Sequence, residues 1–66
     1  MVAWRCFFLN RSGQVGSIEQ MDGTLDGAEA LHLCRLMLLS TGSYDAFELW
    51  QGARRVHAEL RHAVAS

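Results

Sequence analysis

The sequence predicts an α+β domain in which one helix packs on a four-stranded, mainly antiparallel sheet, with the elements in the order ββαββ. Two alternating apolar and polar stretches flank turn signals at Gly13 and at Gln51-Gly52, a pattern typical of paired antiparallel strands. One leucine-rich segment with helical spacing of its apolar residues lies between these hairpins. The length of 66 residues allows a single domain, so these elements must share one core.

The first hairpin is predicted from residues 2–9, which are rich in aromatic and β-branched side chains, and from a return strand over residues 14–21. Residues 10–13 form the turn, and Gly13 suits the left-handed position that ends a three-residue loop. Such a loop places three pairs of residues opposite each other: Leu9 and Val15, Cys6 and Ile18, Arg5 and Glu19. The face expected to meet the helix then carries Trp4, Cys6, Phe8, Gly16 and Ile18.

The helix is predicted over residues 27–40. Asp26 followed by Glu29 matches the capping pattern of a short polar residue with an acid three positions later. Gly42 is expected to end the helix in the left-handed conformation. The buried stripe comprises Ala30, Leu31, Cys34, Met37 and Leu38, whereas Leu36 and Leu39 lie off this stripe and remain exposed hydrophobic side chains.

The second hairpin is predicted to start near Tyr44 and to run to about Glu59, with residues 61–66 frayed or helical. Its two-residue loop register places Glu48 opposite Arg55, a favourable cross-strand pair. In this register Val56 and Ala58 share the helix-facing side with Phe47 and Leu49, and His57 shares the opposite side with Trp50. The predicted spatial order of the four strands is 2-1-3-4, with the most apolar strand in the centre.

Four segments together resemble a group of small proteobacterial proteins of unknown function. They are Arg5-Cys-Phe-Phe-Leu9, the Ser12-Gly13 turn, the Asp26…Glu29-Ala30 helix start, and Glu48-Leu-Trp-Gln-Gly52 with Arg54, Arg55 and Val56. The resemblance implies a bacterial, intracellular protein with the ββαββ order. Members usually carry more acidic residues in the first turn and before the helix, and Asn10, Arg11 and Thr24 depart from that pattern. The family has no assigned activity, so the resemblance transfers no functional residue.

The amino-acid composition disfavours several classes of protein. Half of the residues are hydrophobic, which is too many for a disordered chain, and the formal net charge is −1. This charge does not supply the general attraction of a nucleic-acid or membrane-surface binder. No secretory signal is recognisable at the start of the chain, and the longest apolar run, residues 36–39, is too short to span a membrane. Cys6 and Cys34 lie in apolar runs without metal-ligand spacing, which favours buried, reduced thiols in a cytoplasmic protein.

No residue pattern indicates catalysis. A cysteine and a histidine could form a nucleophile–base pair, but nothing fixes such a pair, and no glycine-rich phosphate loop follows a strand. His32 and Cys34 lie on opposite sides of the helix, and His57 and His62 on opposite faces of a strand. We therefore expect a non-enzymatic protein with no catalytic, cofactor or metal site.

The side of the sheet away from the helix is the predicted interaction surface. It should display Arg5, Phe7, Leu9, Val15, Trp50, Arg55 and His57. Exposed apolar patches usually mark protein interfaces, and tryptophan and arginine are typical anchors. The sequence therefore predicts a small cytosolic interaction module that forms a homodimer through this face or through the exposed helix leucines Leu36 and Leu39; an unknown protein partner is a further possibility. The alternative is a single-stranded RNA- or DNA-binding domain that stacks bases on the aromatic side chains, which the net charge disfavours.

Overall fold

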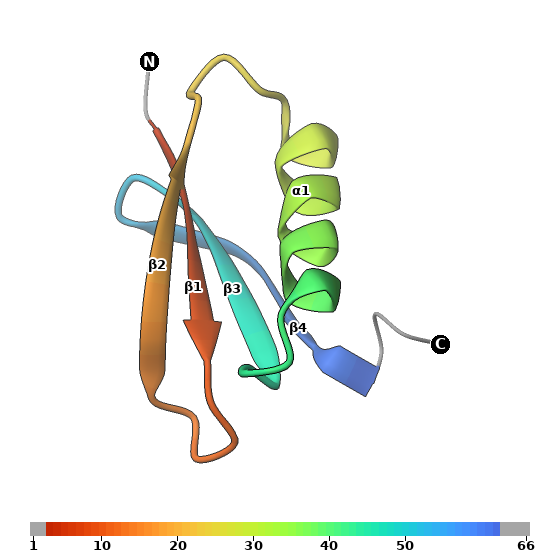
Figure 1. Cartoon of the computed structure of the whole chain (residues 1–66). Coiled ribbons are helices and arrows are strands. Elements are labelled where there is room, and N and C mark those ends of the chain that lie inside the picture. Colours follow the sequence, from red (N-terminus) through yellow and green to blue (C-terminus); the bar gives the residue numbers. More distant parts are fainter. Residues whose placement is uncertain (1–2, 63–66) are drawn as a thin grey trace.

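The computed structural model describes residues 3–62, which form one four-stranded sheet with a single helix on one side (Figure 1). The strand order is β2-β1-β3-β4, and all neighbours are antiparallel. These findings confirm the predicted α+β class, the ββαββ order and the spatial order of strands. The predicted start of the first strand at Val2 and the tail from residue 63 lie outside the described residues. The elements are β1 (Trp4–Leu9), β2 (Val15–Met21), α1 (Gly27–Ser40), β3 (Ala46–Gln51) and β4 (Arg54–Leu60).

The core lies between α1 and the two inner strands. Alternate residues of β1 and β3 point toward the helix and pack against the centre of its predicted apolar stripe. Phe47 and Leu38 are completely buried, and burial of a side chain of this size contributes about 1.5–3 kcal/mol. Cys6 and Cys34 are also buried and free, which confirms the predicted core position of both thiols. The core comprises Trp4, Cys6, Phe8, Ala30, Cys34, Leu38, Phe47 and Leu49.

The N-terminal end of α1 follows the predicted capping pattern. The backbone N–H of Glu29 donates to Asp26 Oδ1 over 2.8 Å, and the backbone N–H of Asp26 donates to Glu29 Oε1 over 3.4 Å. The two bonds satisfy donors that an isolated first turn would leave unpaired, at a gain of about 1 kcal/mol.

The C-terminal end of α1 differs from the prediction. Gly42 does not take a left-handed conformation; instead Thr41 leaves the helix with extended dihedral angles, φ −111° and ψ 141°. The terminal carbonyl groups are satisfied by Arg61, which follows β4 and donates from Nη2 to Leu38 O (2.8 Å) and to Thr41 O (2.6 Å), and from Nε to Tyr44 O (2.7 Å). A positive charge at this end also complements the helix dipole. The C-terminal end of the helix is therefore capped by Arg61, 20 positions after Thr41, and not by Gly42 as the local sequence predicts.

The first hairpin has the predicted three-residue loop, with Gly13 at φ +85°, and Leu9 lies opposite Val15 as expected. A β-bulge then shifts the register. Gly16 is the extra residue, so Cys6 lies opposite Glu19 and Arg5 opposite Gln20. The predicted pairs of Cys6 with Ile18 and Arg5 with Glu19 are therefore wrong. A bulge moves every later residue of the strand to the other face, so Ile18 leaves the helix side and Glu19 joins it.

The second hairpin deviates in the same manner. Its loop is Gly52-Ala53, with Gly52 at φ +61°, and not Gln51-Gly52. Arg55 thus lies opposite Trp50, which corrects the predicted pairing with Glu48. A bulge at Val56 then places His57 opposite Leu49 and Ala58 opposite Glu48. The predicted sides of His57 and Ala58 are therefore exchanged.

On the helix side of the sheet, β4 contributes a charged contact to α1. Glu59 accepts two hydrogen bonds from Arg35, over 2.8 and 2.7 Å, and its Oε1 lies 2.9 Å from His57 Nε2. The Arg35 guanidinium, assisted by His57, lowers the pKa of Glu59 to about 2. This contact attaches the outer strand β4 to the helix. The strand itself ends at Leu60, one residue later than predicted, and residues 61 and 62 are helical.

Candidate interaction surface

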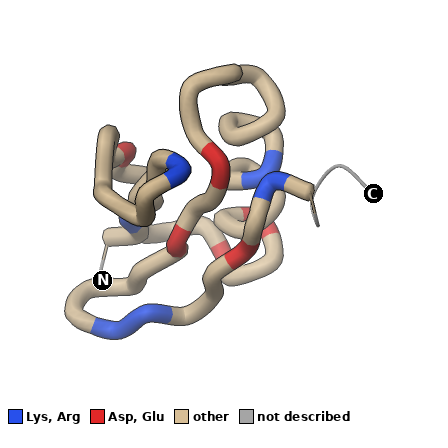
Figure 2. Tube along the Cα trace, turned by 90° about the horizontal axis from the view of Figure 1, so that it is seen from below, with Lys and Arg blue, Asp and Glu red and all other residues tan. Residues whose placement is uncertain are grey.

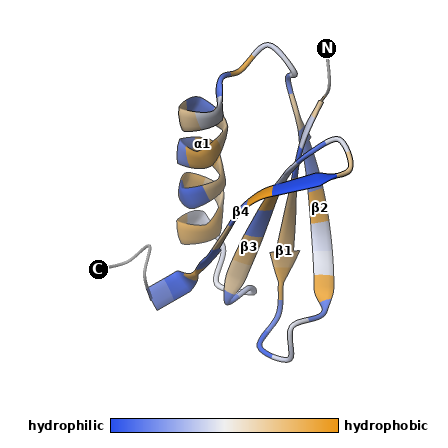
Figure 3. Ribbon diagram, turned by 180° about the vertical axis from the view of Figure 1, so that it is seen from behind, coloured by the Kyte–Doolittle hydropathy of each residue, from blue (hydrophilic) through white to orange (hydrophobic). Residues whose placement is uncertain are grey.

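The face of the sheet away from α1, here called the open face, displays side chains from all four strands. The strand registers place these side chains in three rows across the sheet, and Figure 3 shows the sheet from behind, coloured by hydropathy. In the order β2, β1, β3, β4, the rows are Val15–Leu9–Ala46–Leu60, Ile18–Phe7–Glu48–Ala58 and Gln20–Arg5–Trp50–Arg55.

Two neighbours, Phe7 and Glu48, hold Trp50 in place on the open face, and Arg55 pairs with Glu48. Its ring lies 5.7 Å from the ring of Phe7, centroid to centroid, and its Nε1 donates to Glu48 Oε1 over 3.1 Å. Arg55 Nη1 lies 3.4 Å from the second carboxylate oxygen of Glu48. These contacts give the open face an ordered aromatic pair with one carboxylate beside it, and an interaction surface of this kind loses little side-chain entropy on binding.

An apolar hollow lies at the end of the open face near the first row. It has a volume of about 250 Å³ and is open to solvent. Ile18 and Leu60, which flank the face on its two outer strands, are 58% and 52% exposed. The residues around the hollow are Leu9, Ala46, Phe47, Glu48, Ala58, Glu59 and Leu60.

Six of the residues predicted for this face lie on it: Arg5, Phe7, Leu9, Val15, Trp50 and Arg55. His57 does not, because the Val56 bulge turns it to the helix side, where its ring lies 6.2 Å from that of Phe47. Leu36 and Leu39 are each 49% exposed, but on the outer surface of α1 and apart from the open face. Sequence reasoning missed Ile18 and Leu60. Gly16 was the available signal, because a glycine inside a strand pattern often marks a bulge.

Charges of both signs accompany this surface. The whole chain has six basic residues and seven acidic residues, and Figure 2 shows the two signs interspersed along the trace. On the open face itself, Arg5 and Arg55 lie in one row and Glu48 in the adjacent row. The surface is therefore apolar with a mixed polar part, and it lacks the strong positive field of a nucleic-acid groove.

Among residues 3–62, no three histidine, cysteine or acidic side chains are grouped so that they could hold a metal ion. The thiols of Cys6 and Cys34 contact each other, and this contact together with burial raises the pKa of Cys6. The hydrogen bond with Cys6 lowers the pKa of Cys34, and burial of this thiol opposes that shift. No helix in the described part of the chain is long and apolar enough to cross a membrane.

No family model, curated protein or solved structure matches the chain. The resemblance to small proteobacterial proteins therefore stays a prediction, and any functional argument must come from the surfaces of this molecule.

Proposed function

We propose that this chain is a non-enzymatic, cytosolic protein-interaction module that forms a homodimer through the open face. The observation that carries the proposal is the apolar surface spread over four strands, which none of residues 3–62 covers (Figure 1). The cytosolic assignment is supported by the two free, buried thiols, since reduced cysteines are typical of that compartment.

Exposed apolar side chains on the open face favour association. Burying a large apolar side chain contributes about 1.5–3 kcal/mol, and the whole stability of a domain is about 5–15 kcal/mol. Val15, Ile18 and Leu60 are at least half exposed. Because each of the three is already about half buried, covering them would contribute about 2–5 kcal/mol per protomer, a substantial fraction of the stability of a small domain. Small domains are commonly stabilised further by oligomerisation.

Two properties favour a second copy of the chain as the partner that covers the open face. A two-fold dimer joins the same patch on both protomers, so the patch must be complementary to itself. The open face meets this condition, because its apolar rows can pack on each other and its charged groups have both signs. Within each protomer the Glu48 carboxylate already accepts from Trp50 Nε1 and pairs with Arg55, so it would enter such an interface with its charge compensated.

Sedimentation equilibrium at micromolar concentration tests the proposal. We expect a dimer for the wild-type protein and a shift to monomer for Phe7→Glu and Trp50→Glu, because each would leave an unpaired charge in the interface. Leu36→Glu is the matched control, since it adds the same charge to the outer surface of the helix. Circular dichroism should show that all three variants are folded. A wild-type monomer would contradict the proposal, and so would dissociation by Leu36→Glu without dissociation by Trp50→Glu.

One observation favours a second candidate function. The row Gln20–Arg5–Trp50–Arg55 places an aromatic ring between two guanidinium groups, an arrangement found where single-stranded nucleic acid stacks on a protein. The Glu48 carboxylate bound to Trp50 and the net charge of −1 oppose it. Titration with a labelled single-stranded RNA separates the two functions. Salt-sensitive binding in the low-micromolar range that Trp50→Ala abolishes would replace the dimer as the primary function.

A further inference from the structure

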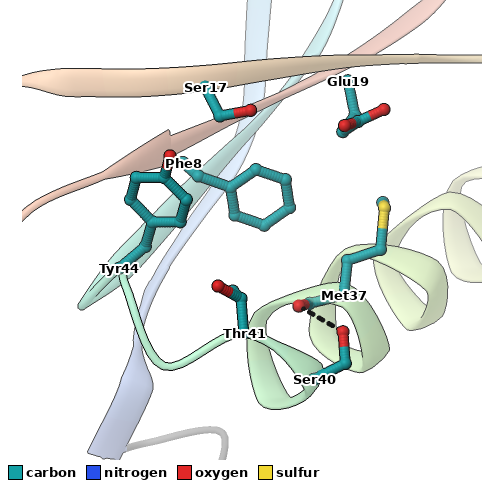
Figure 4. Close-up of a pocket in the computed structure, with 7 residues that line it drawn as sticks. All are labelled: Phe8, Ser17, Glu19, Met37, Ser40, Thr41 and Tyr44. Carbon is teal, nitrogen blue, oxygen red and sulfur yellow. Dashed lines mark hydrogen bonds between the residues drawn. The ribbon is translucent and has the colours of Figure 1, made fainter.

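On the helix side of the sheet, the residues that the structure describes cover the outer strand β2 only at its ends, where Tyr44 lies against Gly16 and Met21 packs against the core. The helix packs against β1 and β3, and β2 lies at the far edge of the sheet from it (Figure 1). A pocket of about 260 Å³ opens in the space between β2 and the C-terminal end of α1 (Figure 4). Its lining comes from four parts of the chain and comprises Phe8, Ser17, Glu19, Met37, Ser40, Thr41 and Tyr44.

One wall of the pocket is formed by two aromatic rings, and one of them lies against the backbone of β2. The rings of Phe8 and Tyr44 are stacked with centroids 5.8 Å apart and an interplanar angle of 29°. Tyr44 approaches β2 so closely that a Cβ atom at Gly16 would lie 2.5 Å from Tyr44 Cε1. The absence of a side chain at the bulge therefore permits the tyrosine position. Met37 adds an apolar, polarisable side chain from the helix (Figure 4).

Among the residues that the structure describes, Glu19 supplies the only charged group of the lining. It lies on this side of the sheet because the Gly16 bulge reverses the faces of β2. Within residues 3–62 no arginine, lysine or histidine pairs with its carboxylate. Ser17, Thr41 and Tyr44, which also line the pocket, carry hydroxyl groups. Thr41 Oγ1 accepts from the backbone N–H of Ser43 over 3.3 Å, and the Ser40 hydroxyl donates to Met37 O over 2.9 Å.

We propose that this pocket binds a small organic ammonium ion with an apolar or aromatic body. The Glu19 carboxylate pairs with the ammonium group, neighbouring hydroxyl oxygens accept its remaining hydrogens, and the apolar body packs on Phe8, Tyr44 and Met37. Aromatic rings attract cations as well as apolar groups. The pocket is smaller than the range of about 300–1,000 Å³ typical of drug-sized ligands, so the ligand must be a small amine.

The charge preference comes from Glu19 and not from the end of the helix. Arg61 already donates to the terminal carbonyl oxygens of α1 and balances the dipole there. The pocket lies on the opposite side of the sheet from the open face, so a dimer formed through the open face leaves it accessible. This inference is therefore independent of the proposed function.

An NMR titration of the ¹⁵N-labelled protein tests the proposal with 2-phenylethylammonium as the probe. We expect saturable shifts of the backbone amides of Ser17, Glu19, Met37 and Tyr44. The matched neutral probe, 2-phenylethanol, has a similar shape but no positive charge, so we expect it to bind about fivefold more weakly or not at all. Absence of saturable shifts with the ammonium probe, or equal binding of the two probes, would overturn the proposal.

Two variants identify the carboxylate responsible. Glu19→Gln keeps the size of the side chain but removes its charge, and we expect binding of 2-phenylethylammonium to weaken about fivefold, the upper end for an exposed ion pair. Asp45→Asn removes one negative charge outside the pocket lining and should leave the dissociation constant unchanged. The amide spectrum of each variant without ligand should show that the fold is retained. Equal weakening in both variants, or no weakening in Glu19→Gln, would contradict the assigned role of Glu19.

Discussion

The inner and the outer strands of this sheet share an alternation of apolar and polar residues, but the alternation predicts the faces of the side chains correctly only in the inner strands. In β1 and β3 the alternation assigns each side chain to the correct face, as Phe8 and Phe47 show by their burial. In β2 and β4 a single bulge reverses the faces of the residues beyond it. An inner strand has a neighbour on each side, and its large apolar side chains have only one core to enter. An outer strand has one free edge, where an extra residue disturbs little.

The two bulges also determine which side chains line the pocket, the open face and the contact with the helix. The bulge at Gly16 moves Glu19 into the helix-side pocket and Ile18 onto the open face. The bulge at Val56 turns His57 toward the helix, where it joins Glu59. The outer strands thus supply the features that sequence alternation alone misplaces.

Replacement of a buried inner-strand residue should have the largest effect on stability. Phe47→Ala removes a fully buried ring and should lower the free energy of unfolding by about 3–5 kcal/mol. Val56→Ala, at the bulge of an outer strand, should cost less than about 1 kcal/mol because Val56 is 44% exposed. Urea denaturation followed by circular dichroism measures both values. Similar losses in the two variants would contradict the division into inner and outer strands.

The next largest effect on stability is expected for Arg61, which follows β4 and caps the C-terminal end of α1. Arg61→Ala leaves the carbonyl oxygens of Leu38, Thr41 and Tyr44 without their charged donor and should cost about 2–3 kcal/mol. Arg54→Ala removes the same charge from an exposed position of β4 and should change stability by less than about 0.5 kcal/mol. Equal effects in urea titrations would show that the charge, and not the cap, matters.

Two glycines allow a comparison of a crowded position with an open one. Gly16→Ala forces Tyr44 or the strand to move and should cost about 1–3 kcal/mol. Gly42→Ala meets nothing within 4 Å and requires no left-handed backbone, so it should stabilise the protein by about 0.4–1 kcal/mol. Thermal unfolding of both variants measures the difference. Destabilisation by Gly42→Ala would restore the left-handed helix end that the sequence predicts.

A smaller effect should appear as a pH dependence of the contact between β4 and the helix. Arg35 lowers the pKa of Glu59 from about 4.5 to about 2, so the ionised carboxylate stabilises the fold above pH 4.5. Because Arg35 is partly exposed, we expect about 1–2 kcal/mol. This contribution should decrease as the pH falls from 4.5 toward 2. Urea titrations of wild type and Glu59→Gln should therefore differ at pH 6 and converge near pH 2, and a difference that is constant with pH would exclude this linkage.

The sequence contains enough local information for the elements of the fold but not for every register. The capping pattern of Asp26 and Glu29 and the loop glycine Gly13 act over a few residues, and both were predictable. The cap supplied by Arg61 was not, because it depends on where β4 ends relative to the helix. For the candidate site, alternation placed Phe7 and Trp50 correctly on the open face, whereas the Gly16 bulge decided the position of Ile18. A glycine such as Gly16 signals a possible bulge, but tertiary packing decides whether the bulge forms and on which side the later residues lie.

The central claim, that two copies join through the open face, is tested most directly by isotope-filtered NOE spectroscopy. Mixed samples of ¹³C-labelled and unlabelled protein report only contacts between different copies. We predict intermolecular NOEs from the side chains of Phe7, Ile18 and Trp50, because these residues share the open face. Intermolecular NOEs confined to Leu36 and Leu39 on the helix, or none at concentrations where the wild type sediments as a dimer, would contradict the claim.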